Sequence, residues 1–272
     1  MFIMWFILAT SLGFLSSKKM LAITLLFISI VLGIFEGVLT PIALACLLTI
    51  ACIGFLHQYS NTTLRIPTEI LLFISTILLV LHFLPGIENL RILDKVTIGP
   101  HSTPYTMYFN FDKALIPFIL FMIVPTLFNA GTSKKQVWWH WILLVISVPL
   151  LLLIAMAIGG LKIEPHFPNW LWQFALANLF FVSLAEEALF RGYIQQRLSK
   201  ITGNLIALFI TAILFGMMHY SGGYLLVIFA ILAGLIYGIA WMWSGKLWIS
   251  TLFHFGFNLT HLLFFTYPMY RA

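Results

Sequence analysis

Long runs of apolar, uncharged residues, separated by short polar breaks, limit what this chain can fold into. About ten such runs follow one another, and several reach the roughly 17–25 residues that a helix needs to cross a bilayer. Only 8% of the 272 residues are charged, whereas soluble domains carry about 25%. The sequence therefore predicts an all-α fold, a polytopic bundle of about 8–10 transmembrane helices in an integral, multi-pass membrane protein.

The polar breaks give the order of the spans. We expect helices at residues 1–15, 20–35, 38–56, 68–84, 114–128, 139–159, 169–200, 204–219, 224–243 and 247–265. The longest polar stretch, residues 87–113, alternates around 105–111 and suggests a short hairpin. It is either an ordinary connection or a cap over a substrate site. We divide the chain there into accessory transmembrane helices with this loop (1–113) and a catalytic bundle (114–272).

The net charge of +6 is spread through short loops. This distribution suits orientation in a membrane, and we expect no nucleic-acid partner. The bias of lysine and arginine between alternate loops favours an outer location for both termini. The lipid bilayer is the partner that the composition itself implies.

Two adjacent carboxylates and an arginine interrupt the seventh run. A carboxylate at the centre of a membrane helix costs about 2.5–3.5 kcal/mol on insertion scales unless it is paired or hydrated. Glu187 and Arg191 are four residues apart and can pair, whereas Glu186 lies about 100° round the helix. We predict that Arg191 holds Glu187 while Glu186 faces a cavity. The alternative is an ion cluster that reaches the interface at the helix end.

Two later spans also carry polar side chains. His254 and Asn258 are four residues apart and share one helix face. Thr202-Gly203 is the strong helix stop between Glu186 and His219. If the chain reverses there, each of the two lies about 16 residues from the turn, and they reach one level on antiparallel helices. We therefore expect these four side chains to meet around one cavity.

These residue types suit the hydrolysis of an amide. A glutamate beside a histidine can deprotonate water, and a histidine with an asparagine amide can donate hydrogen bonds to a developing oxyanion. A zinc site is the rival interpretation, with Glu186, His219 and His254 as three ligands and an open fourth position. Because zinc leaves Asn258 and Glu187 without a role, and the His-Glu-x-x-His motif is absent, we favour a mechanism with no metal or other cofactor.

The three motifs, in this order, resemble those of the CAAX-processing and bacteriocin-processing (CPBP) family of intramembrane endopeptidases, which includes the CAAX prenyl protease 2 type. The family pattern is Glu-Glu-x-x-x-Arg, then Phe-x-x-x-His, then His-x-x-x-Asn or Asp. The sequence matches it at residues 186–191, 215–219 and 254–258. The resemblance covers roughly residues 173–265, and the first 110 residues resemble no family that we can name.

The resemblance implies a glutamate-type intramembrane endopeptidase, a hydrolase acting on a membrane-associated peptide or protein, in the inner (plasma) membrane of a bacterium. It assigns water activation to Glu186 with His219, oxyanion stabilisation to His254 with Asn258, and support to Glu187 with Arg191. The additional N-terminal helices leave the class of substrate open.

Two interpretations outside proteolysis remain. In the first, the protein is a bacteriocin-immunity or scaffold factor and the polar cluster only holds helices together; hydrogen bonds of this kind contribute about 0.6 kcal/mol on average in membranes. In the second, Glu186 and Glu187 carry protons or ions in a transporter. The sequence shows no internal repeat or paired broken helices, so we rank the transporter last.

Overall fold

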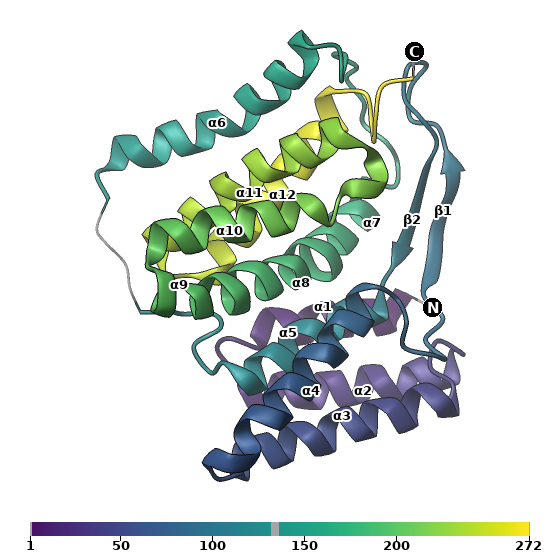
Figure 1. Ribbon diagram of the computed structural model, residues 1–272. Coiled ribbons are helices and arrows are strands. Elements are labelled where there is room, and N and C mark those ends of the chain that lie inside the picture. Colours follow the sequence, from purple (N-terminus) through teal and green to yellow (C-terminus); the bar gives the residue numbers. More distant parts are fainter. Residues whose placement is uncertain (1, 132–135, 272) are drawn as a thin grey trace.

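The computed structural model describes residues 2–131 and 136–271 and is a helical bundle, as predicted (Figure 1). The α-helices are α1 (Phe2–Phe14), α2 (Lys19–Phe35), α3 (Pro41–Tyr59), α4 (Thr62–Val80), α5 (Phe111–Ile123), α6 (Trp138–Ala157), α7 (Leu171–Leu176), α8 (Leu184–Glu187), α9 (Gln196–Thr202), α10 (Asn204–Met217), α11 (Tyr224–Ser244) and α12 (Leu247–Phe264). Two π-helices, η1 (Ala177–Ser183) and η2 (Ala188–Gln195), join α7, α8 and α9, and a 3-10 turn, η3 (Tyr220–Gly222), precedes α11. A helix is present in each of the predicted spans.

Five helical segments in the described part of the chain are long and apolar enough to cross a membrane. They are Pro41–Tyr59, Thr63–Val80, Trp138–Ala157, Leu171–Thr202 and Tyr224–Ser244. The apolar helices α1, α2 and α10 are shorter. The length and composition of these segments make the chain an integral membrane protein.

Local signals explain several helix ends. α3 begins with Pro41 at its first turn, after Thr40, whose side chain accepts a hydrogen bond from the backbone of Ala43 at 3.4 Å. Gly203 separates α9 from α10 with a φ of 81°, and Gly245 ends α11 in the left-handed region with a φ of 66°. α10 packs back on α9 and η2, which confirms the predicted reversal at Gly203.

The segment from Leu171 to Thr202, which we call the central rod, is one continuous helical segment of 32 residues. It is the most buried of the long spans. It packs against α5, α10 and α12, so that it crosses the interior of the bundle (Figure 1). Its turns widen to the π form on both sides of α8. Such widened turns are rare and often mark functional sites, and they place the two adjacent glutamates between two irregular stretches.

The polar stretch between α4 and α5 contains the expected hairpin. Strands β1 (Leu90–Val96) and β2 (Tyr105–Phe109) pair antiparallel, with Leu90 opposite Phe109. The hairpin lies at one end of the bundle (Figure 1). Phe109 at the end of β2 packs edge-on against Trp5 of α1, with ring centroids 5.3 Å apart, and against Phe181 of η1, at 5.7 Å. The hairpin is therefore joined to the first helix and to the central rod.

A buried glutamate holds the connection between the two strands in place. Glu164, in the segment between α6 and α7, accepts hydrogen bonds from the Ser102 hydroxyl at 2.6 Å and the His101 backbone N–H at 2.9 Å. His166 Nε2 lies 3.1 Å from the same carboxylate. A Cβ on Gly99 would lie 2.4 Å from a Glu164 oxygen, so a larger residue at this position would displace the carboxylate. Burial alone would raise the pKa of Glu164, but these hydrogen bonds outweigh it and lower the pKa below 4.5.

We predict that acid weakens the hydrogen bonds by which Glu164 holds the connection between β1 and β2. Because the folded state holds the pKa of Glu164 below its ordinary value, the stabilisation is complete above pH about 4.5 and is lost as the pH falls through the lowered value. Hydrogen exchange of residues 99–103 should therefore be slow at neutral pH and accelerate in acid beyond the intrinsic pH effect. Glu164→Gln should remove this dependence, whereas Asp94→Asn, at an exposed site on β1, should retain it. Equal exchange rates of residues 99–103 in wild type and Glu164→Gln at neutral pH would contradict this role of Glu164.

Candidate active site

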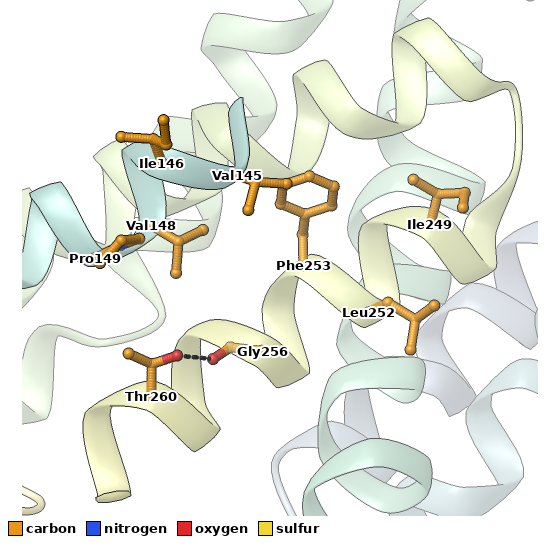
Figure 2. A pocket seen from close by; sticks show the side chains of 9 residues that line it. All are labelled: Val145, Ile146, Val148, Pro149, Ile249, Leu252, Phe253, Gly256 and Thr260. Carbon is orange, nitrogen blue, oxygen red and sulfur yellow. Dashed lines mark hydrogen bonds between the residues drawn. The ribbon is translucent and has the colours of Figure 1, made fainter. Parts of the chain in front are cut away.

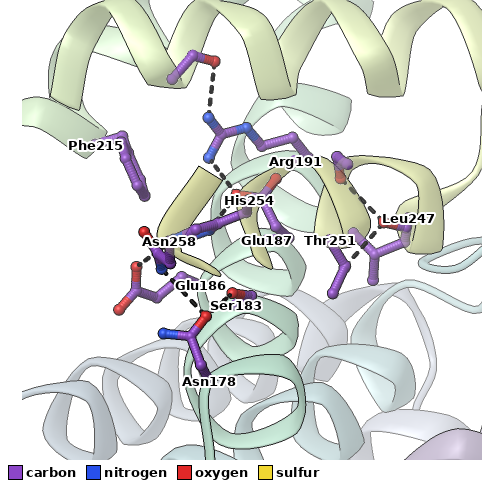
Figure 3. A network of polar contacts seen from close by, with 12 residues as sticks. Asn178, Ser183, Glu186, Glu187, Arg191, Phe215, Leu247, Thr251, His254 and Asn258 are labelled. Carbon is purple, nitrogen blue, oxygen red and sulfur yellow. Dashed lines mark hydrogen bonds and ion pairs between the residues drawn. The ribbon is translucent and has the colours of Figure 1, made fainter. Parts of the chain in front are cut away.

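The predicted polar side chains come from separate elements that meet beside the central rod (Figure 3). Glu186 and Glu187 end α8, His254 and Asn258 lie on α12, and His219 follows α10. The contacts of α8 with α5 and α12 bring these elements together.

Glu187 and Arg191 form the centre of the cluster. Arg191 Nη1 donates to Glu187 Oε1 at 3.1 Å, and Nη2 donates to the backbone carbonyl of Gly234 on α11 at 2.8 Å. The side chains of both residues are 0% exposed. The predicted pairing is therefore confirmed, and the alternative of a cluster reaching the interface is wrong.

His254 is held by the same carboxylate. Its Nδ1 lies 3.0 Å from Glu187 Oε1, and an ionised carboxylate can only accept, so Nδ1 carries the proton of this hydrogen bond. Tyr237 of α11 stacks on the imidazole with centroids 4.7 Å apart and an angle of 12° between the planes. The ring is thereby oriented with Nε2 toward Glu186, 4.0 Å from Oε2.

Glu186 differs from its neighbour in its surroundings. Its side chain is 18% exposed, while that of Glu187 is fully buried. Lys113 of α5 faces it, with Nζ 3.5 Å from Oε1. Sequence reasoning missed Lys113, because it lies 73 positions away in a polar connection and no periodic pattern links it to the central rod.

Asn258 is bound by a second residue that sequence reasoning missed. Its Nδ2 donates to Asn178 Oδ1 at 3.2 Å, and the Ser183 hydroxyl donates to the same oxygen at 3.1 Å (Figure 3). Asn178 and Ser183 are five residues apart on η1, which matches the wider π spacing. The sequence feature that could have identified Asn178 is an amide side chain within an apolar run.

His219 approaches the cluster indirectly. Its Nδ1 donates to the backbone carbonyl of Phe215 at 2.9 Å, which leaves Nε2 outside that bond. The Phe215 ring packs against both histidines, 4.8 Å from the ring of His219 and 5.6 Å from that of His254. His219 lies in the neighbourhood of Glu186, but within the described residues no direct hydrogen bond joins the two. The expectation that Glu186 and His219 share one level on antiparallel helices stays a prediction.

The zinc alternative requires three donor side chains grouped around one ion. Across residues 2–131 and 136–271, no three histidine, cysteine, aspartate or glutamate side chains are grouped closely enough to hold one metal ion. The arrangement of Glu186, His219 and His254 therefore does not fit the three-ligand site.

An apolar groove of about 520 Å³ lies between α6 and α12 (Figure 2). Its α12 lining includes Gly256 and Thr260, each two positions after a predicted site residue and so about 200° round the helix. The groove therefore lies on the face of α12 opposite to His254 and Asn258. A separate cavity of about 130 Å³, between β2 and η1, is lined by Asn178 and Tyr105 and lies on the hairpin side of the cluster.

Comparison with known proteins supports the family resemblance that the motifs indicated. The family model described as type II CAAX prenyl endopeptidase Rce1-like matches residues 168–260. The matched segment contains Glu186, His219, His254 and Asn258, whereas Lys113 lies outside it. Searches of curated proteins and of solved structures gave no match.

We predict that Arg191 is essential for stability. Arg191→Met leaves the buried Glu187 charge without its cation, and breaking a buried pair in this way costs about 3–5 kcal/mol. In a detergent thermal-unfolding measurement this corresponds to a decrease in Tm of at least about 6 °C. Arg197→Met, which removes a 41% exposed arginine paired with Glu69, is the matched control and should change Tm little.

A double variant separates charge from packing. Glu187→Gln combined with Arg191→Met leaves no unpaired charge and should recover part of the lost Tm. If Arg191→Met and Arg197→Met had equal effects, the buried pair would not have the role described.

Proposed function

We propose that the protein is an intramembrane endopeptidase of glutamate type, a proposal supported by the match of residues 168–260 to the type II CAAX prenyl endopeptidase Rce1-like family model. At the level of the family, the match supports a CAAX endopeptidase embedded in a membrane. Beyond this family-level function, we propose the mechanism, the roles of the residues and the absence of a metal. Placement in the inner (plasma) membrane of a bacterium stays a prediction.

The observation that carries the proposal is the contrast between two adjacent carboxylates. Glu187 is sealed from solvent and engaged by Arg191 and His254, whereas Glu186 is partly exposed beside them. Pairs of carboxylates in different environments commonly divide their roles, one reacting and one supporting. A cluster needed only for helix association would leave no reason for the exposed carboxylate.

In the proposed reaction, ionised Glu186 removes a proton from water, with His219 assisting from the end of α10. The hydroxide attacks the carbonyl carbon of the scissile peptide bond and gives a tetrahedral oxyanion. The C–N bond then breaks as the proton held by Glu186 passes to the leaving amine. Water is consumed, and one carboxyl and one amino terminus are produced.

His254 and Asn258 stabilise the oxyanion in this proposal. Asn258 has two amide hydrogens and uses one for Asn178, so that one remains for the substrate oxygen. His254 donates through Nε2, which requires a proton there while Nδ1–H stays bound to Glu187. Preorganised donors of this kind are worth most in a dry site, where they need no reorganisation during the reaction.

The substrate that suits this site is a membrane-associated peptide or protein. The catalytic side chains lie among helices that cross the bilayer, so a scissile bond must be presented from the membrane or its surface. The family match adds the expectation of a CAAX-type C-terminus. A lipid on the substrate cysteine would hold the peptide at the bilayer, and parallel assays with lipidated and unlipidated peptides test that requirement.

Glu186→Gln should abolish cleavage without unfolding the protein. Removing a general base lowers the rate by about 10²–10⁴. The measurement is the turnover of a fluorogenic CAAX peptide in proteoliposomes, with Tm as the check on folding. Asp94→Asn, a change at an exposed acidic residue of β1, should keep full activity. Cleavage retained by Glu186→Gln would remove the mechanism, and cleavage retained by Glu186→Gln/His254→Ala would favour a non-enzymatic role.

Chelators should leave the wild-type rate unchanged. The described residues contain no grouped metal ligands, and the mechanism uses side chains alone. The assay is repeated after exhaustive treatment with 1,10-phenanthroline and with EDTA. Loss of activity that zinc restores would instead establish the metalloprotease alternative.

A further inference from the structure

Lys113 brings a cation to the site from outside the segment that matches the family. Its Nζ lies 3.5 Å from Glu186 Oε1, and both side chains are 18% exposed. In the part of the chain that the structure describes, no other lysine or arginine has its charged group within 4.0 Å of Glu186. Arg191, the nearest alternative in sequence, is committed to Glu187 and to the carbonyl of Gly234.

The first turn of α5 holds Lys113 through a fixed set of hydrogen bonds. The backbone N–H of Lys113 donates to Asp112 Oδ1 at 2.8 Å, and Asn89 Nδ2 donates to Asp112 Oδ2 at 3.0 Å. His82 Nδ1 contacts the same Oδ2. Asn89 also accepts from the Phe111 backbone N–H at 2.8 Å. These hydrogen bonds, made by residues of the connection between α4 and α5, thus fix the position of the Lys113 backbone.

The charge balance at Glu186 explains why such a residue is needed. Removal of water disfavours an ionised carboxylate, and Glu187 places a like charge at the next position. Opposite charge within about 4–6 Å favours the ionised form that a general base requires. The groups facing Glu186 are Lys113 from α5, His254 from α12 and His219 beyond α10. Of these, only the lysine has a side chain that is positively charged without taking up a further proton at neutral pH.

We propose that Lys113 is a positioning residue that keeps Glu186 ionised and directed toward the attacking water. This inference rests on the proposed function, in which Glu186 is the base. It also gives the segment 1–113 a part in the chemistry, because the connection that contains His82 and Asn89 sets the position of Lys113.

The test compares Lys113→Met and Lys113→Arg with wild type in proteoliposomes, using a fluorogenic CAAX peptide. Lys113→Met should lower kcat about 10- to 100-fold, because the fraction of ionised base decreases, and leave KM within about twofold. Lys113→Arg retains the positive charge and should recover most of kcat. Lys200→Met, at an exposed position near the end of α9, is the matched control and should behave as wild type.

The outcomes separate this inference from the function on which it rests. If wild type cleaves, Glu186→Gln does not, and Lys113→Met keeps kcat within twofold, the positioning role is wrong while the proposed function stands. If Lys113→Met loses activity but Lys113→Arg fails equally, or Tm decreases in parallel, packing rather than charge is responsible and the inference is also wrong. If wild type and Glu186→Gln cleave equally, the proposed function itself fails.

Discussion

The buried ion pair between Arg191 and Glu187 is the interaction on which the rest of the site depends. An unpaired charge in this interior would be very unfavourable, so the two side chains fix each other, and Arg191 also binds the Gly234 carbonyl. Through Glu187 the pair reaches His254 on a third element. One carboxylate oxygen of Glu187 therefore connects the central rod to α12, and Arg191 connects the rod to α11.

The central rod presents Glu186 and Glu187 to different surroundings because neighbouring residues lie about 100° apart round a helix. π-helical turns on both sides of α8 alter the spacing of side chains, so Asn178 and Ser183 meet at an interval of five residues while Glu187 and Arg191 still meet at four. Within α8 itself, Glu187 is sealed and Glu186 is accessible. In the proposed mechanism the sealed group supports His254 and the accessible group reacts.

The N-terminal helices and the hairpin complete the surroundings of this centre. Trp5 of α1 and Phe181 of η1 pack against Phe109 and against each other. The next helix begins two residues after Phe109 with the turn that carries Lys113. The division of the chain at residues 113 and 114 stays a prediction, because α5 packs both on the N-terminal helices and on the central rod.

Much of this arrangement was accessible from the sequence, for physical reasons that also set the limit. Apolar runs of membrane length give the helices, and two carboxylates in such a run have to be paired or hydrated, so Arg191 could be assigned to Glu187. Spacing along a regular helix cannot reveal π turns, so Asn178 and its contact with Asn258 were missed. Lys113 was missed because its approach to Glu186 depends on how the polar connection folds back. The level of His219 could be estimated, but the bond from its Nδ1 to Phe215, which turns the ring, could not.

The most direct test of this account is the protonation of the His254 ring, measured by ¹⁵N NMR on protein labelled at histidine, with His254→Gln to assign the signals. Because Glu187 accepts a hydrogen bond from Nδ1, the account predicts that Nδ1 carries a proton in the resting protein, and that Glu187→Gln perturbs this resonance more than those of the other histidines. A His254 ring with an unprotonated Nδ1 would contradict the arrangement from which the oxyanion donor and the role of Glu187 were derived.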